Sequence, residues 1–123
     1  MQVTVEPQSS GTAVLKLSGR LDLLSAMTLR QEFAKIVAAG RHRLVVDLSA
    51  VDFIDSTGLG SLVSGLKTAR MAGGDLRLAG ATDQALTILK LTTLDRVLKP
   101  YATTGGGPGW LLNRALRIAQ TTY

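Results

Sequence analysis

The chain has 123 residues, of which 46% are hydrophobic and 19% charged, and its formal net charge is +5. This length suits one globular domain and is too short for an enzyme with a cleft between two lobes. The absence of cysteine excludes disulfides, thiolate metal ligands and a cysteine nucleophile.

We expect a cytoplasmic protein without a membrane span. No apolar run approaches the roughly 20 residues that a membrane-spanning helix requires. The start, "MQVTVEPQSS", has neither the basic leader nor the apolar core of a signal peptide.

The excess of positive charge lies in the C-terminal part of the chain. Residues 90–123 hold five basic side chains against one acidic side chain, whereas residues 1–89 hold nine against eight. The five are spread out, and the whole chain offers only five aromatic residues as stacking platforms for bases. The composition therefore favours a mildly basic surface over direct nucleic-acid binding.

The N-terminal part of the chain alternates between strand and helix patterns. Residues 2–6 and 13–19 have apolar side chains at every second position, and the turn sequence "PQSSGT" between them predicts an antiparallel hairpin. Helical spacing follows in "SAMTLRQEFAKIVAAG", with Ser25 as the predicted N-cap and Gly40 as the stop. Residues 43–48, "RLVVDL", are apolar on both faces at their centre, which is typical of an interior parallel strand.

The alternation continues beyond the turn "FIDSTGLGSL". The expected elements are a helix that ends at Gly73, a strand over residues 75–80, a short helix over 82–91 and a last strand over 97–101. Pro100 confines that last strand to the edge of a sheet, because proline has no N–H to donate. The order predicts an α/β sandwich with a mixed β-sheet, in which an N-terminal antiparallel hairpin precedes parallel strands and helices pack on the sheet.

A tail follows the predicted sheet. Residues 103–109, "TTGGGPG", form a Gly-rich linker, and "WLLNRALRIAQ" after it has one apolar face and one basic, polar face. We therefore divide the chain into a domain of residues 1–102 and a tail of residues 103–123. The short amphipathic helix expected in the tail could pack on the sheet, stay loose, or dock on a partner or an anionic surface.

The turn of residues 55–60 joins the end of an apolar strand to a helix N-terminus, where ligand sites of α/β sheets gather. Ser56 lies at or next to the N-cap, so its hydroxyl could satisfy an N–H of the first helical turn. Gly58, Gly60 and Gly65 each cost up to about 1 kcal/mol of helix stability relative to alanine. Glycines at these positions indicate that something approaches the backbone closely.

Common catalytic motifs do not fit these residues. The chain has no G-x-S-x-G elbow at this turn and no G-x-x-x-x-G-K or G-x-G-x-x-G loop for phosphates. We interpret His42, in the basic turn "RHR", as a surface residue rather than a metal ligand, because no second His, Cys or convergent carboxylate accompanies it. Asp47 is similar to the phosphoacceptor of a receiver domain, but the paired acids for Mg²⁺ are missing, so a bond to the following turn is the better interpretation.

Four segments resemble the STAS domains, and specifically the bacterial anti-sigma factor antagonists. In chain order they are "GRLD" (19–22), "LVVDLSAVDFIDSTGLGSL" (44–62), "GGDLRLAG" (73–80) and "ILKLTTLDRVL" (88–98). The resemblance covers about residues 2–101. It ends in the tail, since family members usually finish with an Ala/Leu-rich helix directly after the last strand.

The resemblance implies a STAS-type sandwich and a partner-switching regulator that is not an enzyme and needs no cofactor. Its unphosphorylated form would bind an anti-sigma factor that is also a serine kinase and thereby free the sigma factor. The family's phosphoacceptor falls on Ser56, and a phosphatase would reverse the modification. The residues matched to the partner surface are Asp22, Asp55, Ser56, Thr57, Gly58, Leu59 and Gly60.

A second interpretation keeps the fold without a phosphorylation cycle. A STAS module can also serve in scaffold assembly or as part of a transporter tail, where the same turn would bind a ligand or a partner. In either case we expect a monomer or a weak dimer.

Overall fold

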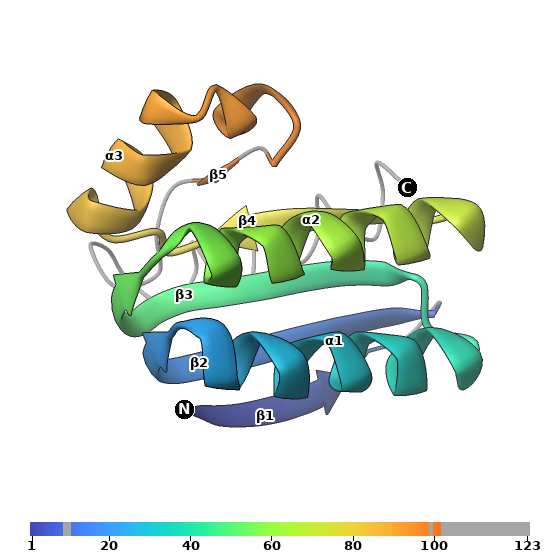
Figure 1. Ribbon diagram of the computed structural model, residues 1–123. Coiled ribbons are helices and arrows are strands. Elements are labelled where there is room, and N and C mark those ends of the chain that lie inside the picture. Colours follow the sequence, from blue (N-terminus) through green and yellow to red (C-terminus); the bar gives the residue numbers. More distant parts are fainter. Residues whose placement is uncertain (9–10, 99, 102–123) are drawn as a thin grey trace.

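A computed structural model describes residues 1–8, 11–98 and 100–101 of the chain (Figure 1). The elements are β1 (Gln2–Pro7), β2 (Thr12–Leu21), α1 (Leu23–Ala38), β3 (Arg43–Ile54), α2 (Ser56–Met71), β4 (Asp75–Ala79), α3 (Asp83–Leu91), a 3₁₀ turn η1 (Leu94–Arg96) and β5 (Pro100–Tyr101). The predicted tail of residues 103–123 lies outside the described residues.

The strands form one mixed sheet in the order β1-β2-β3-β4-β5. Strands β1 and β2 pair antiparallel as a hairpin, and the later neighbours are all parallel. Helices α1 and α2 lie side by side across one face of the sheet (Figure 1). The predicted α/β sandwich with a mixed sheet is confirmed.

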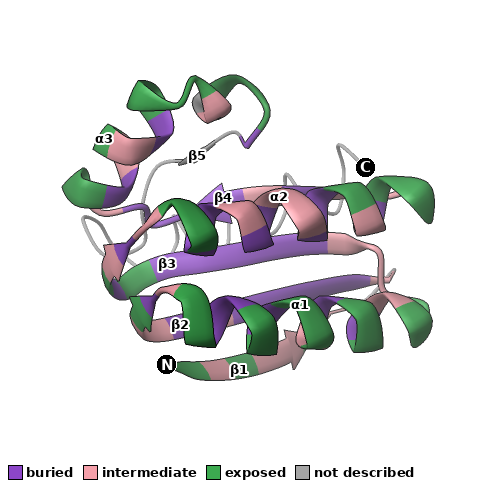
Figure 2. Cartoon of the chain, viewed as in Figure 1, coloured by how far each residue is buried: buried purple, intermediate pink, exposed green. Residues whose placement is uncertain are grey.

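The core lies between this face of the sheet and the helices. Alternate residues of the strands, such as Leu15 and Val46, point toward the helices, and Phe33 of α1 and Leu62 of α2 meet them there. All four are at most 1% exposed, and burying a side chain of this size stabilises a fold by about 1.5–3 kcal/mol. Figure 2 shows the buried strands beneath helices whose outer faces are exposed.

Helix α1 begins two residues earlier than its expected cap, so the prediction of Ser25 as N-cap is wrong. Asp22 is the N-cap, and its carboxylate accepts a hydrogen bond from the Ser25 N–H at 3.4 Å. The Ser25 hydroxyl in turn accepts one from the Asp22 N–H at 2.8 Å. This reciprocal capping box satisfies two backbone donors and fixes the end of β2 against the start of α1.

Strand β3 runs to Ile54, well past the predicted end at Leu48. Its pairing with β2 shifts register twice, and each shift adds one residue to β3, which is the geometry of a β-bulge. At the first shift the Ser49 N–H donates to Asp47 at 2.9 Å. Asp47 therefore does bond the segment after it, as expected, but that segment is a bulge inside the strand and not a turn.

The last strand is shorter than predicted. Among the described residues, only Pro100 and Tyr101 pair with β4 on this side, opposite Leu78 and Ala79. The proline stands at the start of this strand, at the edge of the described sheet, where its missing N–H removes no interior ladder bond.

Candidate functional site

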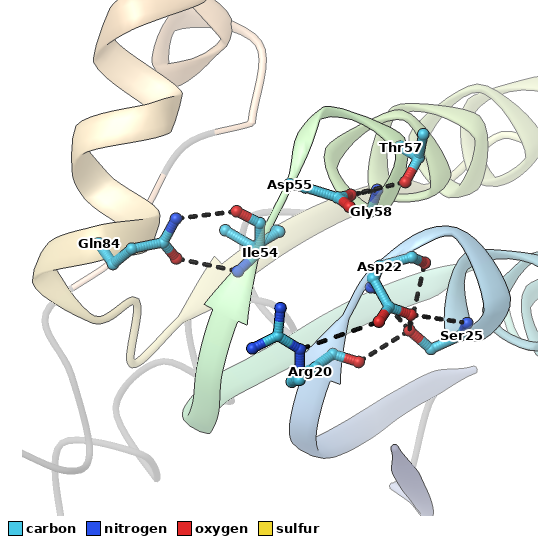
Figure 3. Close-up of polar contacts among 8 residues, drawn as sticks. All are labelled: Arg20, Asp22, Ser25, Ile54, Asp55, Thr57, Gly58 and Gln84. Atoms are coloured by element: carbon cyan, nitrogen blue, oxygen red, sulfur yellow. Dashed lines mark hydrogen bonds and ion pairs between the residues drawn. The ribbon is translucent and has the colours of Figure 1, made fainter.

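Asp55 lies between β3 and α2 and is the N-cap of that helix. Its Oδ1 accepts a hydrogen bond from the Gly58 N–H at 2.8 Å and another from the Thr57 hydroxyl at 2.6 Å (Figure 3). The Thr57 bond is the main cause, and the Gly58 bond the second, of a lowered pKa of the Asp55 carboxyl. The carboxylate is therefore ionised at neutral pH and held in one orientation.

Ser56 is the first residue of α2, and its side chain is exposed. Within the described part of the chain its hydroxyl makes no hydrogen bond, because Asp55 already caps the helix. The interpretation of Ser56 as a helix cap is thus wrong, although its position next to the cap is as expected. A serine with a free, exposed hydroxyl is accessible to a modifying enzyme.

The glycines of α2 have different neighbours. A Cβ on Gly58 would lie 2.1 Å from the carbonyl oxygen of Leu21, and one on Gly65 would lie 2.5 Å from the ring of Phe33. At these two positions the close approach inferred from sequence comes from the protein's own β2 and α1. A Cβ on Gly60 would meet only the Arg30 guanidinium, at 3.6 Å, so the Gly60 side of the helix is open.

Two residues of the expected partner surface are buried. Leu59 is 1% exposed and belongs to the core, and Gly58 is buried beneath Leu21. Packing explains both, and neither has a surface to offer a partner. The matched residues that reach the surface are Asp22, Asp55, Ser56, Thr57 and Gly60.

The structure brings the start of α1 and the start of α2 together. The Asp55 N–H donates to the Leu21 carbonyl at 3.3 Å, which ties the loop of Asp55 to the residue before Asp22. Arg20 lies 3.9 Å from the Asp22 carboxylate, its guanidinium is 4.2 Å from the centre of the Phe53 ring, and its charge also lowers the pKa of Asp55. Two carboxylates and one arginine thus converge where β2 and β3 end (Figure 3).

Sequence reasoning missed a clamp at the end of β3. The Gln84 side chain donates to the Ile54 carbonyl at 2.8 Å and accepts from the Ile54 N–H at 2.9 Å (Figure 3). Strand β4 pairs with β3 only as far as Asp47, so no described strand is a neighbour of Ile54 on that side. A side-chain amide replaces the missing strand and fixes the residue just before Asp55.

An apolar surface at the start of α1 was also missed. Leu23, Leu24 and Met27 are 62%, 79% and 61% exposed. Beside them lies an open depression of about 400 Å³, whose lining residues are Met1, Arg20, Asp22, Leu24, Ser25 and Thr28. The sequence signal was available, because these apolar residues fall outside the core stripe of the helix.

His42 is less exposed than the predicted surface position implies. It is half-buried between α1 and β3, and its carbonyl accepts the Asp75 N–H at 3.0 Å. Among the described residues, no three His, Cys, Asp or Glu side chains gather as a metal site. No helix in the same described ranges is long and apolar enough to cross a membrane.

Comparison with known proteins identifies the fold family. The family model described as "Mlab, STAS domain" matches residues 5–100. The chain belongs to the STAS domain family. The resemblance inferred from the four sequence segments is therefore confirmed, and this STAS domain contains both helix starts described above.

Its relatives include anti-sigma factor antagonists. The STAS domain is 28% identical over 108 residues to the anti-sigma-B factor antagonist of Bacillus subtilis, covering 87% of this chain and 98% of that protein. It is 31% identical over 96 residues to the anti-sigma-F factor antagonist RsfB of Mycobacterium tuberculosis, covering 76% of each chain. SpoIIAA from Bacillus has the same fold, with a TM-score of 0.75 and 16% identity over 95% of this chain and 98% of that chain for the unphosphorylated form.

Proposed function

We propose that this STAS domain is a cytoplasmic anti-sigma factor antagonist that acts by partner switching and is not itself an enzyme. Its unphosphorylated form binds an anti-sigma factor serine kinase, which releases the sigma factor. Phosphorylation of Ser56 abolishes this binding, and a phosphatase restores it. Relatives named anti-sigma factor antagonists support the choice of partner.

The observation that carries the proposal is the free hydroxyl of Ser56 beside an ionised Asp55. Because Asp55 is the cap, Ser56 can be modified without loss of a hydrogen bond that holds α2. A phosphate adds about −1.5 to −2 charge at neutral pH, and a helix N-terminus tolerates negative charge. The fold should therefore survive a modification that changes the surface. SpoIIAA, which has the same fold, has been solved in a phosphorylated form.

The surroundings of Ser56 support a protein partner. Leu23, Leu24 and Met27 lie in the first turns of the helix that Asp22 caps and are exposed, and clustered exposed apolar side chains next to polar ones are typical of protein–protein contact surfaces. A dianion at Ser56 would sit at the edge of this surface. Desolvating that charge would oppose binding of any partner that had covered the apolar residues.

A ligand-binding STAS module without a phosphorylation cycle is the second candidate. The depression beside Leu24, which contains both Arg20 and Asp22, favours it because it offers a concave surface with charges of both signs. This candidate predicts that binding does not depend on the state of Ser56.

Co-purification from the native cell tests the proposal. Wild type and Ser56→Ala should both retain an anti-sigma factor with an ATPase-type kinase domain, and ATP should release it from wild type only. Ser56→Asp should retain little of it, although one carboxylate mimics a dianionic phosphate only in part. Thr4→Asp, which adds the same charge at an exposed site on β1, is the matched control and should behave as wild type.

The residue that the kinase phosphorylates is identified separately. After incubation with the retained kinase and ATP, mass spectrometry should find phosphate on Ser56 and none on the alanine variant. Phosphate on Thr57 would show that the residue assignment is wrong while the switch is retained. Equal retention by all variants, with no label on either residue, would contradict the phosphorylation switch and favour binding that does not depend on Ser56.

A further inference from the structure

Helices α1 and α2 run parallel, and side chains of α1 lie against two glycines of α2. The Phe33 ring lies against Gly65, and the Arg30 guanidinium lies over Gly60, with its Nη2 atom 3.6 Å from the place of a Cβ. Both helices begin at the end of the sheet where β2 and β3 end (Figure 1). Arg30 is therefore the residue of α1 that reaches across the open side of the first turns of α2.

Ser56 lies on the same side of α2 as Gly60. Residues four apart on a helix are neighbours on one face, separated by about one turn of 5.4 Å. Side chains on a helix lean toward its N-terminus, so the Arg30 side chain leans toward the end of α2 that carries Ser56. A phosphate on Ser56 would also lean toward this end, about one turn beyond Gly60, so the Arg30 side chain would reach it by crossing Gly60.

Arg30 is available for a new ionic partner. Its side chain is exposed and, in the described ranges of the chain, makes no ion pair or hydrogen bond. Arg20, the other arginine near the site, is already engaged with Asp22 and with the Phe53 ring. The nearby carboxylates of Asp22 and Asp55 lie next to Arg20, which pairs with Asp22 and lowers the pKa of Asp55.

The geometry points to Arg30 as the internal counter-ion of a phosphate on Ser56, bound across the bare backbone of Gly60. The inference rests on the proposed function, which makes Ser56 the acceptor. A guanidinium can bind two phosphate oxygens at once, and the absence of a side chain at Gly60 leaves room for this pair. In the phosphorylated state the Arg30 side chain crosses and covers Gly60, so the switch adds charge and also closes an open part of the contact surface.

The test measures the second ionisation of the phosphate and needs neither the kinase nor the partner. Phosphoserine is incorporated at position 56 during translation, and its ³¹P signal is followed against pH in the full chain. A nearby cation lowers a phosphate pKa, so Arg30→Gln should raise that pKa by about 0.2 to 0.7 pH units, the range expected for an exposed ion pair. Arg30→Lys should recover part of the difference.

Lys67→Gln is the control that removes the same charge from an exposed site on α2. Eleven residues of helix separate it from Ser56, about 16 Å along the axis and beyond the screening length of about 8 Å at physiological salt, so it should leave the ³¹P titration unchanged. Equal titrations for Arg30→Gln and Lys67→Gln would overturn the inference. So would a shift seen with Arg20→Gln and not with Arg30→Gln.

These outcomes are separate from those of the proposed function. A kinase that fails to label Ser56 would overturn partner switching by phosphorylation, whereas the ³¹P titration would still report whether Arg30 reaches a phosphate placed there. Loss of the Arg30 effect together with normal labelling of Ser56 would remove only the counter-ion.

Discussion

Asp55 and Ser56 are neighbours, but only Asp55 holds the helix. The Asp55 carboxylate accepts the Gly58 N–H at 2.8 Å, whereas the Ser56 hydroxyl is exposed and makes no hydrogen bond to the described residues. Replacing an N-cap aspartate by alanine costs about 0.5–2 kcal/mol, and an exposed substitution away from such features stays within about 0.5 kcal/mol. Urea unfolding should therefore rank Asp55→Ala well below Ser56→Ala in stability. A larger loss for Ser56→Ala would show that the serine has a structural role.

Asp55 should also make stability depend on pH. The bonds from Thr57 and Gly58 lower the folded-state pKa of Asp55 below its ordinary value of 3.8. A carboxyl with a depressed folded pKa contributes stability that is complete above its unfolded pKa and is lost as the pH falls through the folded value.

Asparagine keeps the cap without titrating, which makes Asp55→Asn the matched variant. We expect the difference in unfolding free energy between wild type and Asp55→Asn to be constant from pH 8 to about pH 5 and to shrink below about pH 4. Urea unfolding at a series of pH values measures it. A difference of the same size at pH 7 and pH 3 would mean that the Asp55 charge does not stabilise the fold.

At the scale of the elements, the first turns of α2 contain one glycine that packs and one that is open. Gly58→Ala would force a Cβ to within 2.1 Å of the Leu21 carbonyl, which is backbone and cannot rotate away. Gly60→Ala places its Cβ in ordinary contact with the flexible Arg30 side chain. Alanine is up to about 1 kcal/mol better than glycine inside a helix.

Gly60→Ala should therefore be neutral or stabilising, and Gly58→Ala should be strongly destabilising. Thermal unfolding of the two variants on the same helix checks this directly. If both variants lost stability equally, the open side at Gly60 would not exist in solution.

The helices and strands could be predicted where the apolar residues follow a regular spacing. Their boundaries could not be predicted where that spacing is interrupted. Period-two and period-3.6 spacing predicted the hairpin, the interior strand and the helices. The cap of α1 was misplaced because Leu23 and Leu24 are apolar but exposed, so the apolar pattern did not mark the helix start. The end of β3 was misplaced because two bulges interrupt its alternation.

The candidate site could be predicted only in part. Sequence could place Ser56 and Asp55 at the junction of a strand and a helix. It could not separate Gly58 from Gly60, because the carbonyl of Leu21 and the guanidinium of Arg30 come from elements that lie about 30 or more residues earlier in the chain. A residue's place in a motif and its exposure are different properties, and only the folded structure gives the second.

At the scale of the whole molecule, a truncated chain tests the division into a domain of residues 1–102 and a tail. The main core cluster is built from residues between Ala13 and Leu98, so deletion of residues 105–123 should leave a domain that unfolds in one cooperative transition. Circular dichroism during urea unfolding measures this.

The alternative is that the domain needs the tail to cover the opposite face of the sheet. Val14 and Val45 pair there and are buried, although they lie outside the main core cluster. A truncated chain that bound a hydrophobic dye and lacked a transition would show that this face requires the tail.

The most direct measurement compares one binding constant in two states of Ser56. Full-length protein with serine at position 56, and the same protein with phosphoserine there, are each titrated calorimetrically with the anti-sigma factor retained by Ser56→Ala. We predict that phosphorylation weakens binding at least about tenfold, or about 1.4 kcal/mol, while both forms remain folded by circular dichroism. Equal affinities of the two folded forms would contradict the account.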